Sequence, residues 1–328
     1  MTSLSVQNTG STAPREQLEL SLDEYKRNSR KDAYKIILMG SGLILPHIVL
    51  VVFEVISLSM IFRSMYFILG VVCFFGGIWE LYRTRRLTVE DLVEKVTEYK
   101  QTREFGLTIE KTAWTYTKVV LACLIVDFVL QEIIGREESI QAAGLVKSAV
   151  RSGEIWRLLT CTTLHGSFLH ILMNGSALIK LGKLIEILTN RAYLPIVFLV
   201  SAVSGSVFSL VLIPNTTSVG ASGGLMGLVG FLAVLGYRHK EKLPPGFFKS
   251  VLISICFIGA IGLVGFAIID NAAHLGGLLA GAICGSLLIK KSTSQNLADA
   301  TGLVKGVGFA SLLAIIIISL LSITMILR

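Results

Sequence analysis

Residues 219–238 read VGASGGLMGLVGFLAVLGYR, and this stretch has no charged side chain before Arg238. A run of about 20 apolar residues has the length of one membrane-spanning helix. Glycine recurs so often along it that one helix face is nearly bare, which lets a neighbouring helix approach closely. A second run, residues 273–285, reads AHLGGLLAGAICG and places Gly277 four residues before Gly281. The sequence therefore predicts two membrane helices whose backbones pack closely. The glycines that leave this face bare are Gly220, Gly223, Gly224, Gly227 and Gly230.

The composition of the whole chain is that of a multi-pass membrane protein. Of the 328 residues, 53% are hydrophobic and 16% are charged, with a mean hydropathy of +0.72. Soluble domains carry about 25% charged residues, so a soluble globule is excluded, as are a collagen-like and a disordered chain. The five cysteines lie singly, which excludes a disulfide framework and a cysteine zinc site. Apolar runs predict nine spans at 36–60, 62–82, 115–134, 166–187, 193–213, 219–237, 249–268, 272–290 and 304–327.

These runs predict an all-α polytopic bundle made of a six-helix core, two extra N-terminal spans and one C-terminal span. The first two spans form a hairpin through Arg63, and this is the shortest predicted connection. The predicted segments are a disordered cytoplasmic tail (1–35), a transmembrane hairpin (36–82), a cytoplasmic amphipathic linker (83–114), the six-helix core (115–290) and an extra transmembrane helix (291–328).

The linker has apolar residues at helical spacing, Leu92, Val93, Val96 and Tyr99. Thr88 and Asp91 form a capping box at its start. A surface helix is the simpler interpretation, and a partner-binding helix is the alternative.

The basic residues predict the orientation in the membrane, because loops rich in Lys and Arg remain on the cytoplasmic side. With a cytoplasmic N-terminus and nine spans, 24 of the 30 Lys and Arg residues fall on the inner side and six on the outer side. The net charge of +8 is therefore explained by membrane orientation, and nucleic acid is not an expected partner. We expect an integral membrane protein of the plasma membrane.

Three polar clusters open predicted spans from the outer face, where polar groups at membrane depth mark a site by default. They are residues 165–174 (HGSFLHILMN), 220–224 (GASGG) and 273–277 (AHLGG). Ser222 and His274 each lie close to the start of a span, and His170 and Asn174 share one helix face because they are four residues apart. The sequence predicts that the three clusters meet at one depth.

The chemistry that these residue types permit is acyl transfer. A serine hydroxyl attacks a carbonyl only when a base takes its proton, and the resulting oxyanion needs fixed hydrogen-bond donors. His274 is the candidate base for Ser222, and His170, Asn174 and the Ser222 backbone N–H are candidate donors. Taken singly, each residue has a simpler explanation: a serine bonded to its own helix, a packed histidine, or interfacial anchors at His165 and His170.

At these positions the chain resembles the rhomboid intramembrane serine proteases. The matching motifs are Gly153 to Arg157, His165 to Asn174, Gly182 with Glu186, Gly220 to Gly223, and Ala273-His274 followed by Gly277 and Gly281. The resemblance implies that Ser222 is the nucleophile and His274 its base, in a dyad without an acidic third member. It implies that His170 and Asn174 join the Ser222 N–H in an oxyanion hole. The structural supports that it implies are His165, Trp156, Arg157 and Glu186, with the close-packing glycines Gly220, Gly223, Gly277 and Gly281.

The chain departs from the family at Met226, where an aromatic residue usually stacks on the catalytic histidine. A methionine sulfur also makes favourable ring contacts, so the dyad is expected to persist. The predicted reaction is hydrolysis of a peptide bond in or beside a transmembrane segment of another protein. Ser167, Thr216, Thr217, Ser218 and Asn271 are expected to line a wet cavity at the site.

Two other functions remain open from the sequence. One is a non-catalytic rhomboid-like protein that binds transmembrane helices, and the other is a transporter, which would show symmetric halves and broken helices. The expected partners are transmembrane protein substrates and the lipid bilayer. No cofactor and no metal is expected, and the sequence leaves the oligomeric state undetermined.

Overall fold

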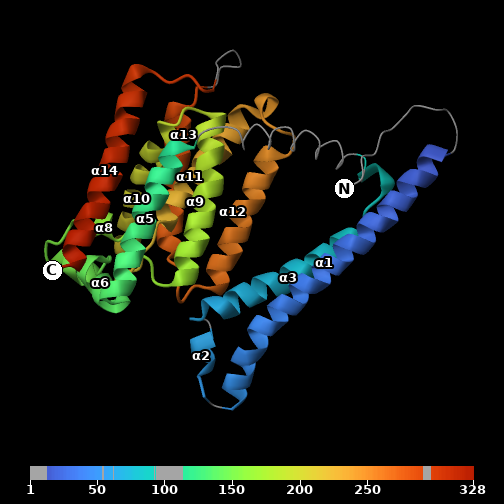
Figure 1. Ribbon diagram of the computed structural model, residues 1–328, viewed down its shortest axis with the longest axis horizontal. Helices are drawn as coiled ribbons and strands as arrows, with labels where there is room; N and C mark the ends of the chain where they lie inside the picture. Colours follow the sequence, from blue (N-terminus) through green and yellow to red (C-terminus); the bar gives the residue numbers. More distant parts are fainter. Residues whose placement is uncertain (1–12, 54, 62, 92, 94–113, 291–296) are drawn as a thin grey trace. The chain divides into compact units, whose positions relative to one another are not determined.

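The computed structural model describes residues 13–328 except residues 54, 62, 92, 94–113 and 291–296. The chain divides into two compact units, Met1–Thr102 and Arg103–Arg328. Of the residues that the structure describes, 79% are helical, and the only β-type pairing among them is an isolated bridge between Leu145 and Ser218. The predicted all-α fold is confirmed (Figure 1).

The first unit is a helical hairpin of α1 (Ala13–Val52) and α3 (Met65–Arg85), with the short helix α2 (Leu58–Ile61) in the connection. Glycine allows the two long helices to approach closely. A Cβ atom built on Gly40 would lie 2.7 Å from the carbonyl oxygen of Gly70.

The first helix ends at Val52, and the expectation of a span that continues to residue 60 is wrong. The reason lies at the start of α3. Ser64 caps α3 by accepting a hydrogen bond from the Phe67 N–H (3.3 Å), and its Oγ lies 2.6 Å from Nε2 of His47 on α1. This contact fixes the start of α3 beside His47, so the chain between them must turn.

The expectation of disorder in residues 1–35 is also wrong for residues 13–35, which belong to α1. Residues 15–39 contain neither Gly nor Pro and are rich in Glu, Leu, Lys and Arg, which favour helix. The polar part of α1 also packs on the hairpin, because Leu22 is buried against Leu87. High polarity here indicates a solvated helix face.

The capping box predicted at the start of the linker is confirmed. The Thr88 N–H and hydroxyl each donate to Oδ2 of Asp91 at 2.8 Å, and the Asp91 N–H donates to Oγ1 of Thr88 at 3.2 Å. The predicted apolar positions Leu92, Val96 and Tyr99 lie outside the described residues.

The second unit is a bundle of long helices with three short helices inserted after the first (Figure 1). Its apolar core is shared by the long helices and centres on fully buried residues such as Leu124, Leu178 and Phe231. The helices are α5 (Thr115–Ile134), α6 (Arg136–Ala143), α7 (Lys147–Arg151), α8 (Arg157–Thr160), α9 (Phe168–Leu188), α10 (Tyr193–Leu212), α11 (Ser222–Arg238), α12 (Phe247–Val264), α13 (Asn271–Leu288) and α14 (Gly302–Ile326).

Six of the described helices are long and apolar enough to cross a membrane: Glu19–Val52 within α1, α3, α10, α12, α13 and α14. The other three predicted spans exist as helices α5, α9 and α11. Helix α11 has only 17 residues, and α5 and α9 carry charged residues along their length. Two of those charges are used inside the bundle, because Asp127 on α5 and Glu186 on α9 are buried and hydrogen-bonded.

Helices α11 and α13 run parallel with their backbones in contact. A Cβ on Gly277 would collide with the carbonyl oxygen of Gly223, and one on Gly281 would collide with that of Gly227. One helix turn further, a Cβ on Gly285 would lie 3.3 Å from the carbonyl oxygen of Phe231. The contact therefore advances four residues at a time on both helices, and the predicted close approach of these two spans is confirmed.

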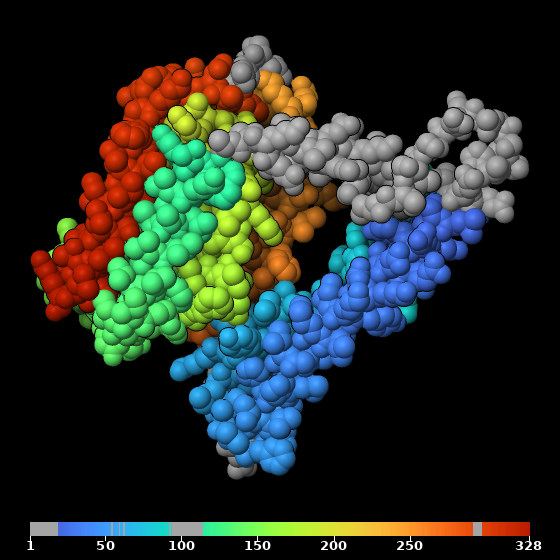
Figure 2. Space-filling view, viewed as in Figure 1, coloured from blue at the N-terminus to red at the C-terminus, as the bar shows by residue number. Residues whose placement is uncertain are grey.

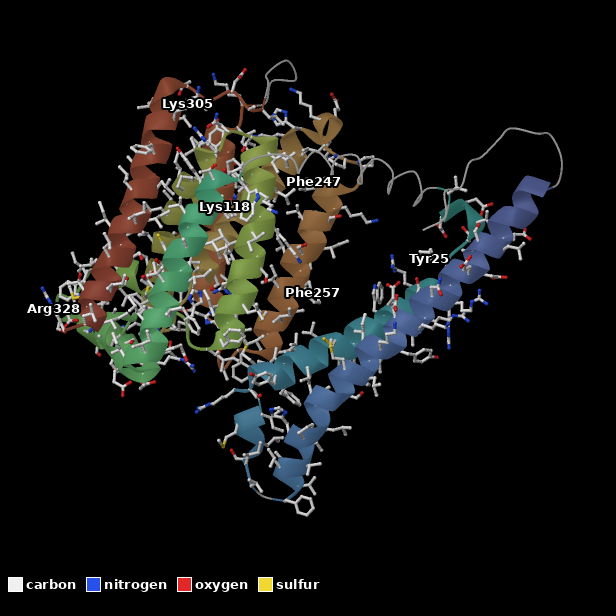
Figure 3. All side chains as sticks on the ribbon, viewed as in Figure 1. Tyr25, Lys118, Phe247, Phe257, Lys305 and Arg328 are labelled. Carbon is white, nitrogen blue, oxygen red and sulfur yellow. The ribbon has the colours of Figure 1, made fainter. Side chains whose placement is uncertain are left out.

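Helix α14 lies against α5, and both lie on the face that Figure 2 shows. The Ser319 hydroxyl donates to Oδ1 of Asp127 on α5 (2.6 Å). In Figure 3, Lys118 near the start of α5 and Lys305 near the start of α14 lie at one end of this unit, and Arg328 lies at the other end. Lys118 and Lys305, which the predicted topology puts on the inner side, thus lie toward the opposite end from Arg328, which it puts on the outer side.

Candidate active site

Ser222 is the first residue of α11, and the loop before it is firmly attached to the rest of the bundle. The Gly220 N–H donates to the carbonyl of Cys161 at 2.9 Å, and Gly220 has a φ of +131°, a conformation that glycine adopts readily. Ser222 lines a cavity of about 30 Å³ together with Ser209, Ser218 and Asp270. A volume of roughly 10–15 Å³ is enough to hold one water molecule, so this polar cavity has room for water next to Ser222.

His274 lies in the first turn of α13, and its position along that helix is fixed by Asp270. Asp270 is the N-cap residue, and its Oδ1 accepts a hydrogen bond from the Ala273 N–H (2.8 Å). The His274 N–H donates to the backbone carbonyl of Asp270 (3.1 Å). The first turn is therefore held by both the side chain and the backbone of Asp270.

The register of α11 and α13 relates the heights of Ser222 and His274. Gly223 lies against Gly277, so Ser222 is level with Gly276, two residues from His274. At a rise of 1.5 Å per residue, the two residues differ by about 3 Å along the parallel helices. The Ser222 hydroxyl and the His274 ring, both within the described residues, make no hydrogen bond with each other. Catalytic hydrogen bonds in proteins without substrate are often long and shorten when substrate binds.

His170 and Asn174 come from α9 and face the loop that carries Ser222. A Cβ on Gly220 would lie 2.7 Å from Cε1 of His170 and 3.6 Å from Nδ2 of Asn174. Ser167 starts this helix by accepting a hydrogen bond from the His170 N–H (3.1 Å). A Cβ on Gly223 would lie 3.6 Å from the carbonyl oxygen of Ala273, the residue before His274. All three polar clusters are therefore brought together, as their spacing predicts.

Two groups in this cluster have unused hydrogen-bonding capacity. Nδ2 of Asn174 is buried and has no hydrogen-bond partner within the described structure. A buried polar group without a partner is costly, and it requires a reason. The His165 ring packs edge-on against that of His170, with ring centroids 5.0 Å apart, and both of its nitrogens also lack partners there. The Asn174 amide is thus a buried donor that faces Gly220, next to Ser222, without an acceptor.

Arg157 fastens the short helices that precede α9. This buried guanidinium donates from Nη1 to the carbonyls of Gln141 and Gly144, each at 2.9 Å, and from Nε to Glu154 at 2.6 Å. Trp156 beside it is half-buried, and its Nε1 has no partner in the described part of the chain. These contacts of Arg157 are those of a structural support.

Glu186 joins the end of α9 to the start of α5. Its Oε1 accepts hydrogen bonds from the Thr117 N–H (2.6 Å) and hydroxyl (2.7 Å), and its Oε2 accepts from the Tyr116 N–H (3.3 Å). A carboxylate at a helix N-terminus satisfies free N–H groups and complements the helix dipole. Gly182, one turn earlier on α9, leaves the room that the Thr117 side chain occupies.

The cavity beside Ser222 has a different lining from the one expected for a wet cavity, since of the predicted lining residues only Ser218 belongs to it. Ser167 caps α9, Thr216 accepts a hydrogen bond from Lys147, and the Asn271 side chain donates to the Gly262 carbonyl at 2.9 Å. The residues that complete the lining were not singled out from the sequence. Asp270 is the most prominent of them. The sequence feature that could have identified it is its position four residues before His274.

Met226 is buried on α11, one turn after Ser222. Within the described ranges, no group of three or more His, Cys, Asp or Glu side chains is arranged to hold a metal ion.

Comparison with known proteins shows that the same region matches a known protein domain. A model of the rhomboid domain matches residues 152–291, which contain all three polar clusters. The chain is 33% identical over 174 residues to the rhomboid protease GluP of Bacillus subtilis, a match covering 51% of this chain and 33% of that protein. It is 35% identical over 154 residues to RHOMBOID-like protein 6, mitochondrial, of Arabidopsis thaliana, covering 45% and 48%. It is 33% identical over 142 residues to Rhomboid-like protease 5 of Toxoplasma gondii, covering 42% and 17%.

The chain thus spans less than half the length of each of these relatives. The match nevertheless falls on the helices that carry Ser222 and His274 and on the segment from Trp156 to Glu186. It agrees with the helical bundle and with helices apolar enough to cross a membrane. Residues 152–291 of this multi-pass membrane protein are thus a rhomboid domain by sequence.

Proposed function

We propose that the protein is an intramembrane serine endopeptidase that hydrolyses a peptide bond in or beside the transmembrane segment of another membrane protein. Ser222 is the nucleophile and His274 is the general base. The observation that carries this proposal is the parallel register of α11 and α13, which sets the two residues within about two helical positions of each other across a glycine contact.

The proposed reaction starts when His274 takes the proton of the Ser222 hydroxyl and Ser222 Oγ attacks the substrate carbonyl. The carbonyl oxygen becomes an oxyanion, and the Ser222 N–H, the His170 ring and the Asn174 amide donate hydrogen bonds to it. The unpartnered Nδ2 of Asn174 supports this assignment, because it is a buried donor with no acceptor of its own. His274 then protonates the leaving amine, which leaves the substrate acyl group on Ser222.

Water completes the cycle by attacking the acyl group, with His274 again as the base. The polar cavity beside Ser222 supports this step, because it provides space of the size of water molecules next to the ester. A helical substrate has its carbonyls engaged in the helix, so its backbone must unwind before attack. Substrate segments with Gly or Pro near the outer face are therefore favoured.

The environment of the reaction is a lipid bilayer, and we place it in the plasma membrane with the N-terminus in the cytoplasm. The excess of basic residues on the predicted inner side supports this orientation. Imaging of a C-terminally tagged chain tests the membrane assignment, and a signal confined to an internal organelle would contradict it.

The test of the proposal is cleavage of a reporter transmembrane helix by the purified protein, together with labelling by a fluorophosphonate. Ser222→Ala and His274→Ala should each abolish both signals, because each removes a reacting group. Asn174→Ala should retain labelling and lose about 10²–10³-fold in turnover, the typical cost of one oxyanion donor. Full cleavage by Ser222→Ala would remove the proposal.

A wild-type protein that binds the reporter helix without cleaving it, and that resists the fluorophosphonate, would instead be a non-catalytic binder of transmembrane helices. The chain's retention of both Ser222 and His274 argues against that function. Solute flux into proteoliposomes would indicate a transporter.

A further inference from the structure

A buried lysine outside the predicted site organises the loop that leads to Ser222. Lys147 on α7 is 2% exposed, and its Nζ donates to the Ile213 carbonyl (2.8 Å), Thr216 Oγ1 (2.8 Å) and Ser218 Oγ (3.3 Å). An ammonium group has three N–H donors, so all of them are used on this one loop. Burial lowers the pKa of Lys147, and the negative charge of Asp270 acts in the opposite direction.

Two serine hydroxyls connect this lysine to Asp270. Ser218 Oγ lies 3.2 Å from Ser209 Oγ, and the Ser209 hydroxyl donates to Oδ2 of Asp270. Asp270 uses its other oxygen, Oδ1, to cap α13. The four side chains come from α7, from the loop before α11, from α10 and from the N-cap of α13.

The donor-to-acceptor direction of these hydrogen bonds is fixed by the two end groups, Lys147 and Asp270. Lysine only donates and an ionised carboxylate only accepts, while each hydroxyl has a single proton to donate. Ser209 uses its single proton on Asp270, so in the contact between the two serines the Ser218 hydroxyl donates to Ser209 while it accepts from Lys147. The opposite charges at the ends compensate each other within a buried region, where an isolated charge would be costly.

The chain also connects the two halves of the proposed dyad. Ser218 lies four residues before Ser222, and Asp270 lies four residues before His274. Ser209, Ser218 and Asp270 line the same cavity as Ser222. A substitution that breaks this series of hydrogen bonds therefore changes the position of the loop before Ser222, of the first turn of α13, or of both.

We propose that Lys147, Ser218, Ser209 and Asp270 form one oriented hydrogen-bond chain that holds Ser222 and His274 at a fixed spacing, with Asp270 as the positioning residue for His274. This inference rests on the proposed function. None of the four residues is assigned a bond-making step. They keep the two reacting groups where attack can occur.

The first test distinguishes the effect of the hydrogen-bond chain from the effect of the N-cap that Asp270 forms on α13. Asp270→Asn keeps an oxygen for the Ala273 N–H but turns an NH₂ donor toward Ser209, and Ser209→Ala keeps the cap and removes the middle link. Each variant should lower kcat for the reporter helix roughly tenfold, the scale of one lost hydrogen bond, with KM unchanged. Asp270→Ala loses both cap and chain, and should lower kcat about 10²-fold, because small misplacements of reacting groups are that costly.

The matched control is Ser201→Ala. Ser201 and Ser209 both lie on α10 and are both fully buried, but the Ser201 hydroxyl has no hydrogen-bond partner within the described residues. Ser201→Ala should keep the wild-type kcat. Lys147→Met combined with Asp270→Asn should lose little more than the more damaging single variant, because both break one chain. Losses that multiply would contradict a connected chain, and wild-type kcat in Asp270→Asn and Ser209→Ala would overturn the proposal.

The second test does not depend on proteolysis. In the Ser222→Ala protein, Ser209→Ala should speed hydrogen exchange at the Ala273, His274 and Ser218 amides, whereas Ser201→Ala should not. Unchanged exchange at Ala273 and His274 would overturn the chain. If the wild-type protein neither cleaves the reporter nor reacts with the fluorophosphonate, the proposed function fails, and the exchange experiment alone decides whether the chain holds the two segments.

Discussion

The contact of helix α13 with α11 and that of helix α14 with α5 are made by different means. Between α11 and α13 there are no side chains at the glycine positions, and backbone rests directly on backbone at Gly277 and Gly281. Helix α14 instead uses polar side chains: Ser319 donates to Asp127 at 2.6 Å, and Ser322 Oγ accepts from the Thr163 hydroxyl at 3.0 Å. The backbone contact between α11 and α13 sets a helix–helix distance that no change of side-chain rotamer can adjust. The hydrogen bonds of α14 hold that helix against the bundle.

The difference predicts where a substitution affects activity and where it affects only stability. The glycine contact positions Ser222 relative to His274, so extra volume there must displace a reacting group. The hydrogen bonds of α14 involve no residue of the cavity beside Ser222. Their loss should therefore lower the free energy of unfolding and leave the turnover of the folded protein unchanged.

The largest effect is expected for Gly281→Ala. Its methyl group would collide with the carbonyl of Gly227, and because the obstacle is backbone, α11 and α13 must move apart. We expect kcat for the reporter helix to fall about 10²-fold, the cost of a misplacement near 1 Å. The free energy of unfolding should fall by about 1–3 kcal/mol, as in other overpacked cores. Turnover and thermal unfolding in detergent measure the two quantities, and wild-type turnover would show that the glycine contact does not position the dyad.

Asp127→Ala should have a large effect on stability alone. It leaves the buried Ser319 hydroxyl without its acceptor on α5, which costs about 1–3 kcal/mol. Asp127→Asn retains an acceptor oxygen at this position and is the matched control, with a smaller loss expected. Thermal unfolding measures the loss, and kcat per folded molecule should match the wild-type value. A fall in kcat as large as that of Gly281→Ala would erase the distinction between the two contacts.

The same distinction explains which features the sequence predicted. Helix bounds within the apolar runs were predicted closely, as with 193–213 for Tyr193–Leu212 and 304–327 for Gly302–Ile326. The close approach of the two helices that carry Ser222 and His274 was also predicted, because glycine spacing and helix geometry are local properties of the chain. In residues 13–35, however, polarity was taken for disorder although the residue types favour helix, and the buried contact of Leu22 with Leu87 was not visible from local sequence.

Long-range polar contacts were the main omission. Lys147 was counted only as a basic loop residue, yet it donates a hydrogen bond to Ser218, which lies 71 positions away in the sequence. Ser209 likewise donates a hydrogen bond to Asp270, 61 positions away. Single polar residues have no periodicity that relates them to partners at such separations. The positions of Ser222 and His274 were therefore predictable in outline, and the polar chain that links their segments was not.

The smallest effect is expected at a glycine that makes no helix contact. A Cβ on Gly259 in α12 would have no heavy atom within 4 Å, in contrast to Gly281 on α13. Gly259→Ala should raise the free energy of unfolding by at most about 1 kcal/mol, because alanine favours helix over glycine by that amount and nothing obstructs the methyl group. The sign is thus opposite to that of Gly281→Ala, although the two substitutions are chemically identical. Thermal unfolding and turnover measure the effect of Gly259→Ala. If this substitution lowers both as Gly281→Ala is expected to do, the losses come from the missing flexibility of glycine. Close backbone approach would then not be the reason for a glycine at position 281.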